Sequence, residues 1–279
     1  MAVAGVLLRP ALPIDETRYL SVAWEMAQGG SLLVPHKNGA IYSGTPPLLF
    51  WLIDLVGRVG GVSELAARLV APAFGVAMLA LTWVLGRRLW PAEGTGAAAA
   101  AVLAGMLGFQ VFPGLTMFDT LLGTATLLGL LAILRAARLP GRTPWAPVGA
   151  ALALGVLAKG AGDPVPPAPG AAERAAVPGG LGWRRLARGV AVAVGVAAAL
   201  VALWLVPAIL LGAPEHRDLI LWKQSSGRMV SSFAHARPWW FILAALPLML
   251  VPWPWKPGVW ASLWGAVHDE DWCLWRGGS

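Results

Sequence analysis

Residues 189–214 read GVAVAVGVAAALVALWLVPAILLGAP, a stretch without a single Asp, Glu, Lys or Arg. A helix needs about 20 mostly apolar residues to cross roughly 30 Å of hydrocarbon, so this stretch predicts a transmembrane span. Three further uncharged stretches predict spans in the same way: residues 69–86, 94–118 and 238–255. We therefore expect an all-α, polytopic helical membrane protein.

Two shorter stretches, residues 120–134 and 143–158, are bounded by charges but keep the Leu, Ala and Gly content of spans. Residues 1–13 are apolar except for Arg9, and a helix of this length reaches only about 20 Å. We interpret them as a truncated first span, because no basic start and no small-residue cleavage site mark a signal peptide. The chain as a whole is expected to hold about six to seven spans.

The composition agrees with a membrane protein. Of the 279 residues, 57% are hydrophobic and 13% are charged, which is about half the charged share of a soluble domain. Lys and Arg number 21 against 14 Asp and Glu, a formal net charge of +7. The basic residues lie in short clusters between apolar runs, so nucleic acid is not an expected partner. The single cysteine, Cys273, excludes a disulfide framework.

The basic clusters predict an orientation, because cytoplasmic loops of helical membrane proteins carry an excess of Lys and Arg. By this rule the cytoplasmic loops are residues 87–93, 135–142 and 184–188. The outer loops are then residues 15–65, 114–119 and 215–237.

One crossing is missing from this topology. The inner loops at 135–142 and 184–188 require an even number of crossings between them, yet only residues 143–158 form a convincing span. Residues 160–182 hold five prolines among Gly and Ala, a composition suited to an extended loop. We divide the chain into a truncated first span at 1–13, an outer loop with interfacial helices at 14–65, a transmembrane core at 66–160, an irregular segment at 161–186, transmembrane segments at 187–255 with an outer loop at 213–238, and a tail at 256–279.

The first outer loop predicts two interfacial helices. One begins near Asp15 and stops at Gly29-Gly30, and the other begins at Pro46-Pro47. Acidic side chains in the first turn of a helix lie at the positive end of its dipole, which favours the ionised carboxylate. On pattern alone, a plain capping role for Asp15 has equal weight.

Asp119 ends the uncharged stretch 94–118 and is expected on the same face of the membrane as Asp15. Charged groups at membrane depth are costly, and they mark functional sites by default. A helix-capping role is the alternative for Asp119. Two acids on one face, beside apolar spans, suit acid–base chemistry on a substrate at the membrane surface.

The third outer loop mixes cations, an imidazole and aromatic residues. Arg217, Arg228 and Arg237 suit a phosphate group, although basic residues beside tryptophans are often interface anchors. His235 suits a metal ligand or a proton carrier, but a lone histidine is more often neither. Lys159 lies at the end of a span, where snorkelling is the alternative role.

Taken in order, these motifs resemble those of bacterial GT-C glycosyltransferases of family 39. The resemblance is to the relatives of aminoarabinose lipid A transferase and dolichyl-phosphate-mannose protein mannosyltransferase. The motifs that carry it are Asp15-Glu16-x-Arg18-Tyr19, Asn38-Gly39-x-x-Tyr42, Pro46-Pro47-Leu48-x-x-Trp51, Asp119, Ala158-Lys159-Gly160, and Gln224-x-x-x-Arg228 followed by His235.

The resemblance implies inverting transfer of a sugar from a polyprenyl-phosphate carrier to a lipid or protein acceptor. The reaction would take place on the outer, periplasmic or exterior face of the bacterial inner membrane, among membrane lipids. Asp15 would be the general base, and Asp119 would be the second acid. The substrate-binding residues would be Glu16, Arg18, Tyr19, Tyr42, Lys159, Gln224 and Arg228.

The sequence departs from the family before its double proline. There the family commonly has a Glu followed by a Lys that binds the carrier phosphate, whereas this chain has Gly44 and Thr45. In the aminoarabinose transferases that Glu and a later His also coordinate a divalent metal. The cofactor is therefore left open, with His235 as the metal ligand to test.

Two other functions remain open. A small multi-span permease is suggested by the apolar spans and Pro-broken segments, and it would place acids inside the spans. An inactive fragment is suggested by Gly44, Thr45 and the missing crossing. For the transferase, we predict that the carboxylates of Asp15 and Asp119 face one cavity, within about 10 Å of each other.

Overall fold

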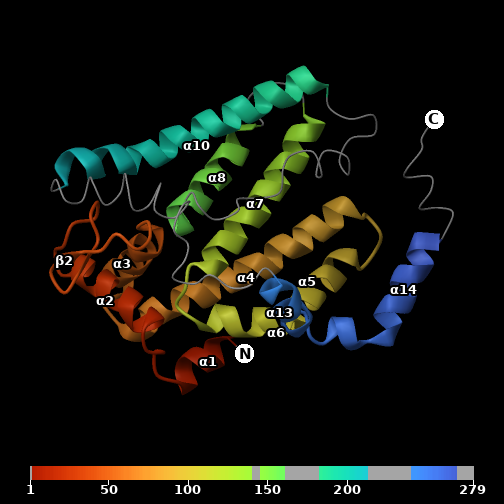
Figure 1. The fold of residues 1–279 in the computed structure, drawn as a ribbon, viewed down its shortest axis with the longest axis horizontal. Helices are drawn as coiled ribbons and strands as arrows, with labels where there is room; N and C mark the ends of the chain where they lie inside the picture. Colours follow the sequence, from red (N-terminus) through yellow and green to blue (C-terminus); the bar gives the residue numbers. More distant parts are fainter. Residues whose placement is uncertain (1, 140–144, 161–181, 213–239, 269–279) are drawn as a thin grey trace.

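A computed structural model describes residues 2–139, 145–160, 182–212 and 240–268 (Figure 1). Its elements are almost all helical, as expected from the sequence. In chain order they are α1 (Ala2–Leu8), α2 (Asp15–Ala27), β1 (His36–Lys37), β2 (Ala40–Ile41), α3 (Leu48–Gly60), α4 (Glu64–Leu89), α5 (Thr95–Gly105), α6 (Leu107–Val111), η1 (Phe112–Gly114), α7 (Asp119–Arg138), α8 (Ala146–Lys159), α10 (Trp183–Leu211), α13 (Phe241–Met249), η5 (Trp253–Trp255) and α14 (Pro257–His268).

Three helices in the described part of the chain, α4, α7 and α10, are long and apolar enough to cross a membrane. The pair formed by α5 and the segment Leu107–Gly114 gives a fourth candidate if the two helices make one broken span. The helix α8 is apolar but shorter. The chain is therefore a polytopic helical membrane protein, as predicted.

The sequence predicted one span over the uncharged stretch 94–118, but the structure does not form a single straight helix there. The stretch bends by 73° between α5 and the next helical segment. Met106 takes an extended conformation there, and the N–H of Leu107 donates a hydrogen bond to the carbonyl of Val251, 2.9 Å away. The indole of Trp253 donates to the carbonyl of Val102, 2.8 Å away. Partners from far along the chain thus replace helical hydrogen bonds at the bend.

The stretch 238–255 also differs from the single span that was predicted. Its described part forms α13, which has nine residues, followed by the short turn η5. Pro252 and Pro254 lack the N–H groups that a continuing helix would need, so the helix ends before them.

The long helices lie side by side (Figure 1). The helix α4 packs against α5 and α7, α7 packs against α8, and α8 packs against α10. Ala67 near the start of α4, Phe118 just before α7 and Ala158 near the end of α8 belong to one buried cluster. The starts of α4 and α7 therefore meet the end of α8 at one end of the bundle.

Two of the three predicted cytoplasmic clusters, those at 135–142 and 184–188, meet at the opposite end. Arg185, in the first turn of α10, donates hydrogen bonds to the carbonyls of Ala136 and Leu139 at the end of α7. The helix α10 begins at Trp183, before the boundary that we placed at residue 187. Trp145, before α8, packs with Ala193, so α8 and α10 start together and run parallel. The missing crossing falls on residues 161–181, outside the described residues.

The first loop forms the two expected helices, α2 and α3, which cover the first end of the bundle. Their buried side chains include Val22 and Met26 of α2 and Phe50 of α3, packed in the same cluster as Phe118. The strands β1 and β2 form a hairpin. Its two turn residues, Asn38 and Gly39, have φ of 53° and 74°, as a two-residue hairpin turn requires.

Candidate active site

Aromatic packing brings the sequence-predicted residues together at the end of the bundle that α2 and α3 cover. The ring of Tyr19 meets that of Phe118 edge to face, with centroids 4.7 Å apart. Phe50 of α3 packs on Phe118 with centroids 5.9 Å apart. Because Phe118 precedes Asp119 and Tyr19 follows Arg18, this packing sets the charged turn of α2 against the start of α7.

Asp119 and Lys159 form an ion pair across two helix ends. The Nζ of Lys159 lies 3.1 Å from Oδ1 of Asp119, and their side chains are 35% and 37% exposed. Asp119 is the first residue of α7 and Lys159 is the last of α8. An anion at a helix start and a cation at a helix end are both favoured by the helix dipoles. The pair is half-buried, so a substrate can reach both charges.

Asp15 and Arg18 form a second ion pair, within the first turn of α2. The guanidinium of Arg18 lies 5.4 Å from the centre of the Tyr19 ring. Burial works to lower the pKa of Arg18, but Tyr42, Tyr19 and the carboxylate of Asp15 outweigh it and raise the pKa. Arg18 therefore stays a cation beside Asp15.

The negative charges of Asp15 and Asp119 both disfavour ionisation of the Tyr19 hydroxyl. Burial is the largest cause that raises the pKa of Tyr19, to about 12, and Tyr42, Asp15 and Asp119 raise it further, against the opposing charge of Arg18. Tyr19 is therefore a neutral hydrogen-bond donor at working pH. Asp15 lies one turn before Tyr19 in α2, and Asp119 follows Phe118, whose ring packs on Tyr19, while the distance between the two carboxylates stays a prediction.

Tyr42 fills the space beside Gly44. A Cβ atom on Gly44 would lie 2.6 Å from the hydroxyl oxygen of Tyr42. The Tyr42 ring is held edge to face on Phe50, with centroids 6.0 Å apart. A side chain at position 44 would therefore require the end of the Tyr42 side chain to shift.

This packing bears on the metal that the resemblance implied. The expected Glu ligand is replaced by Gly44, and Tyr42 occupies the room that its side chain would need. Among the described residues, no group of three or more His, Cys, Asp or Glu residues is arranged to hold a metal ion. Gly44 supplies no metal ligand, and His235, the other expected ligand, lies outside the described residues.

Three polar atoms near these charges lack a hydrogen-bond partner within the described ranges. They are Nε of Arg18 and the hydroxyls of Thr45 and Thr120, and all three are buried. Buried polar groups are nearly always hydrogen-bonded, so unused ones suit a polar ligand or water. Thr120 was not foreseen, although its place directly after Asp119 is a usable signal.

Glu16 was expected to bind substrate, but its side chain is only 1% exposed. Its carboxylate accepts hydrogen bonds from the backbone N–H groups of Leu12 and Thr116 and from Arg9. These contacts leave no exposed oxygen for a substrate, so we assign Glu16 a structural role. The remaining expected residues, Gln224, Arg228 and His235, lie outside the described residues.

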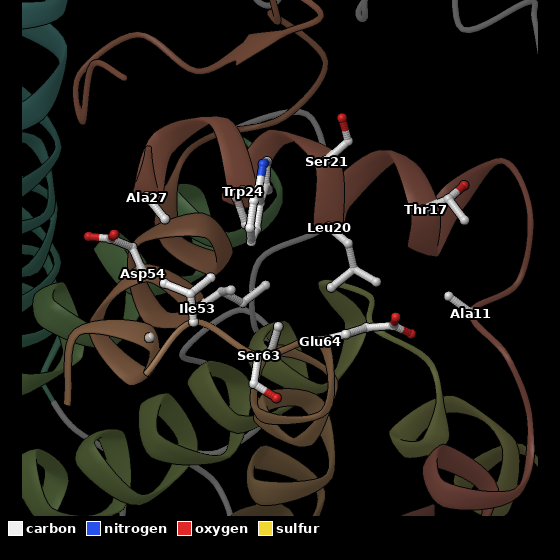
Figure 2. Close-up of a pocket in the computed structure, with 14 residues that line it drawn as sticks. Ala11, Thr17, Leu20, Ser21, Trp24, Ala27, Ile53, Asp54, Ser63 and Glu64 are labelled. Carbon is white, nitrogen blue, oxygen red and sulfur yellow. The ribbon is translucent and has the colours of Figure 1, made fainter. Parts of the chain in front are cut away.

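Two cavities lie in this part of the molecule, and Asp119 lines one of them. One, of ≈ 460 Å³, lies between α2, α3 and the start of α4. Figure 2 shows Trp24 and Leu20 reaching from α2 toward Ile53 of α3. The other, of ≈ 530 Å³, lies between α4, α5 and α7 and is lined by Asp119 and by apolar side chains such as Leu122. Neither of these two is lined by both acids, so the shared cavity stays a prediction.

Comparison with known proteins gives a consistent result. The dolichyl-phosphate-mannose-protein mannosyltransferase family matches residues 44–210. The chain is 31% identical over 250 residues to the undecaprenyl phosphate-alpha-4-amino-4-deoxy-L-arabinose arabinosyl transferase of Pseudomonas aeruginosa strain LESB58, covering 86% of this chain and 44% of that protein. It is 30% identical over 276 residues to arabinosyl transferase 1 of Sodalis glossinidius, covering 93% and 48%.

The fold has a solved counterpart in ArnT from Cupriavidus metallidurans. The crystal structure bound to undecaprenyl phosphate matches with a TM-score of 0.73 and 20% identity, over 96% of this chain and 49% of that chain. The apo crystal structure matches with a TM-score of 0.67 and 21% identity, over 95% and 48%.

The family match, together with this apolar helix bundle and its charged end, places the chain in the class of GT-C glycosyltransferases. Within that class, the chain belongs to the dolichyl-phosphate-mannose-protein mannosyltransferase family, which matches more than half of its residues. The chain spans less than half the length of the curated relatives named above.

Proposed function

We propose that this chain transfers a sugar, with inversion, from a polyprenyl-phosphate carrier to a lipid acceptor. The observation that carries the proposal is a pair of ion pairs, Asp15–Arg18 and Asp119–Lys159, on two elements that the packing of Tyr19 on Phe118 joins. The relatives are named for moving 4-amino-4-deoxy-L-arabinose from undecaprenyl phosphate, which supports this donor class.

Asp15 is the general base in this proposal. Its side chain is 45% exposed and is held by Arg18. The carboxylate takes the proton of the acceptor hydroxyl as that oxygen attacks the anomeric carbon. The bond from the sugar to the phosphate breaks on the opposite face, which gives inversion.

The cations stabilise the leaving phosphate. As the glycosidic bond breaks, negative charge grows on the polyprenyl phosphate, and positioned cations stabilise that charge most in the transition state. Arg18 and Lys159 supply charge-assisted hydrogen bonds for this purpose. Asp119 holds Lys159 in place, 3.1 Å away, and the buried hydroxyls of Thr45 and Thr120 are further donors toward the phosphate.

In this proposal the reaction takes place at the outer face of the bacterial inner membrane. Arg185 and the end of α7 lie at the end of the bundle opposite to Asp119 and Lys159. Because basic clusters favour the cytoplasmic side, the charged cluster would face the periplasm or exterior.

A lipid acceptor such as lipid A is favoured over a protein acceptor, because the relatives matched over most of this chain are aminoarabinose transferases. A permease is disfavoured, because Asp119 and Lys159 are terminal residues of their helices rather than residues inside a span.

The test is sugar transfer by the purified chain in proteoliposomes. Undecaprenyl phosphate carrying labelled 4-amino-4-deoxy-L-arabinose is supplied with lipid A in one arm and with a serine- and threonine-rich peptide in another. We expect label on lipid A. Label on the peptide alone would show that the acceptor is a protein. In a third arm the free labelled sugar is supplied, and its uptake, without transfer in the other arms, would favour the permease.

A further inference from the structure

Glu16 follows Asp15 in the chain, but their side chains have different surroundings. The side chain of Asp15 is 45% exposed, whereas that of Glu16 is 1% exposed. The two oxygens of Glu16 bind separate parts of the protein. Oε2 accepts from the N–H of Leu12, 2.8 Å away, and Oε1 accepts from the N–H of Thr116, 2.7 Å away and 100 residues further along the chain.

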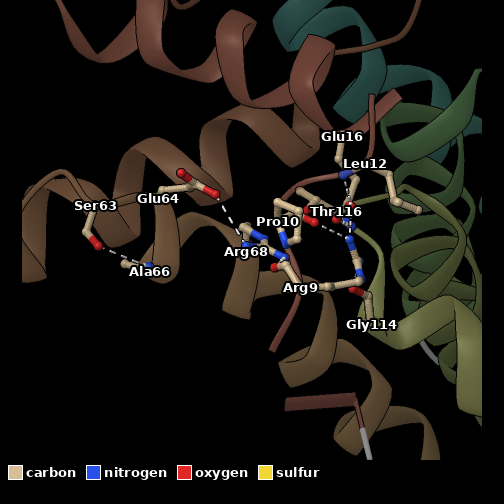
Figure 3. Close-up of polar contacts among 10 residues, drawn as sticks. All are labelled: Arg9, Pro10, Leu12, Glu16, Ser63, Glu64, Ala66, Arg68, Gly114 and Thr116. Atoms are coloured by element: carbon tan, nitrogen blue, oxygen red, sulfur yellow. Dashed lines mark hydrogen bonds and ion pairs between the residues drawn. The ribbon is translucent and has the colours of Figure 1, made fainter. Parts of the chain in front are cut away.

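Two arginines extend these contacts into a network (Figure 3). Arg9 donates to Oε2 of Glu16 and to the carbonyl of Gly114. Arg68 of α4, whose side chain is 7% exposed, donates to the carbonyl of Arg9 over 2.9 Å. We call these three side chains, with the backbone of Leu12, Gly114 and Thr116, the Arg9–Glu16 network.

The network joins three segments that lie far apart in the sequence. They are the connection from α1 to α2, the loop that leads from η1 to α7, and the first turns of α4. Asp15 is next in sequence to Glu16, and Asp119 lies three residues after Thr116, the hydrogen-bond partner of Glu16. Every link to the loop runs to backbone atoms of Gly114 or Thr116, so the network fixes where the chain passes.

We propose that Glu16 is a positioning residue, which holds the loop before Asp119 at a fixed place relative to the turn of α2 that carries Asp15. The effect of Glu16 on sugar transfer rests on the proposed function, but its hold on the loop does not. A misplacement of about 1 Å in a site can lower the rate about 100-fold. Loss of this carboxylate should therefore slow turnover without removing any group that touches substrate.

The charge state of Glu16 supports this role. Burial favours the neutral acid, but the hydrogen bond from Arg9, the N–H groups of Leu12 and Thr116, and the charge of Arg9 together lower the pKa of Glu16 to about 2. The carboxylate is thus ionised throughout the working range of pH and does not exchange protons there. A positioning role predicts that the pH dependence of turnover keeps its shape when Glu16 is replaced.

The experiment compares Glu16→Gln with Glu64→Gln in the full chain. The control also removes a carboxylate paired with an arginine, but Glu64 is 64% exposed and its pair with Arg68 spans 3.3 Å. Hydrogen–deuterium exchange is followed on the peptide covering residues 112–118. We expect the Thr116 amide to exchange at least about tenfold faster in Glu16→Gln and unchanged in Glu64→Gln. The Gln side chain keeps only one acceptor oxygen for the donors Arg9, Leu12 and Thr116, which the carboxylate serves with two.

Turnover is measured per folded protein in the same variants. We expect kcat for sugar transfer to fall about 100-fold in Glu16→Gln, with KM for the donor within about twofold and an unaltered pH profile. A raised KM with unchanged kcat would show that Glu16 contacts substrate, and would overturn the inference. Exchange at Thr116 as slow as in the wild type, or faster exchange spread over the whole chain, would overturn it as well.

A second variant covers a failure of Glu16→Gln to fold. Arg9→Lys keeps the positive charge but has one nitrogen in place of the two guanidinium nitrogens that reach Glu16 and Gly114, so it should also speed exchange in residues 112–118. Unchanged exchange there would count against the network. If the wild type transfers no sugar while exchange responds as expected, the proposed function fails and the hold on the loop stands.

Discussion

The Nζ of Lys159 lies 3.1 Å from Oδ1 of Asp119, which joins the last residue of α8 to the first residue of α7. The two residues are 40 positions apart in the chain. Their pairing brings two helix ends together, so that a cation and an anion lie side by side at this end of the bundle.

Lys159→Met should weaken donor binding far more than it weakens the fold. A half-exposed ion pair contributes about 0–1 kcal/mol to stability, whereas a charged hydrogen bond to a phosphate is worth about 1.5–3 kcal/mol. We expect Kd for undecaprenyl phosphate to rise by at least about tenfold, measured by calorimetry in detergent, and Lys159→Arg to restore part of the binding. The control is Lys256→Met, which removes a cation that lies over Trp253. Equal affinity in Lys159→Met and wild type would remove Lys159 from the phosphate site.

The pKa of Tyr19 tests whether Asp15 and Asp119 both lie near its hydroxyl. The chain has two tyrosines, so Tyr42→Phe leaves Tyr19 alone for a titration of tyrosinate absorbance. In this background we expect the pKa of Tyr19 to stay above its ordinary value but below the wild-type value of about 12, because Tyr42 is one of the groups that raise it. Adding Asp15→Asn or Asp119→Asn should lower this pKa, because each removes a negative charge that disfavours tyrosinate.

Asp54→Asn serves as the control for that titration, because Asp54 pairs with Arg58 on α3. It should leave the pKa of Tyr19 unchanged. If Asp119→Asn also left it unchanged, Asp119 would lie too far from Tyr19 to share a site with Asp15.

Glu16 should make stability depend on pH in the acid range. Its pKa is lowered from 4.5 to about 2 in the folded chain. The stabilisation is complete above pH 4.5 and is lost as the pH falls from 4.5 toward 2, because the unfolded chain binds the proton first. The shift corresponds to about 3 kcal/mol.

Thermal unfolding in detergent, from pH 7 down to pH 2, tests this window. The difference in Tm between wild type and Glu16→Gln should stay constant down to about pH 4.5 and shrink below it. Glu64→Gln should show no such change. A difference that instead disappeared between pH 5 and 8 would mean that another group is responsible.

Position 44 should reject a side chain because of Tyr42. We expect Gly44→Ala to lower the free energy of unfolding by about 1 kcal/mol, since the new methyl group would overlap the Tyr42 hydroxyl. In a Tyr42→Ala background the cost should vanish, as a double-mutant cycle of unfolding energies would show. Gly60→Ala is the control, because nothing lies within 4 Å of a Cβ there. The same cost in both backgrounds would contradict the packing.

The parts of this fold that follow local rules could be predicted from the sequence. Uncharged stretches predicted the helices α4 and α10, and helix start and stop signals predicted α2. The resemblance pointed to Asp15, Asp119 and Lys159, which the structure gathers near Tyr19.

What could not be predicted depends on contacts between distant segments. The bend at Met106 is held by Val251 and Trp253, which a local pattern does not reveal. The resemblance implied that Glu16 binds substrate, but its carboxylate is buried against Thr116, which lies 100 residues away in the chain. Side-chain direction at adjacent positions is set by such tertiary partners.

The rate of sugar transfer by Asp15→Asn, set beside Asp54→Asn, tests the catalytic role of the clustered carboxylates most directly. Both substitutions remove a carboxylate that pairs with an arginine on its own helix, but only Asp15 is proposed to take the acceptor proton. A lost general base lowers kcat by about 100-fold or more, so we expect that loss in Asp15→Asn and nearly wild-type turnover in Asp54→Asn. Wild-type turnover in Asp15→Asn would contradict the proposed base.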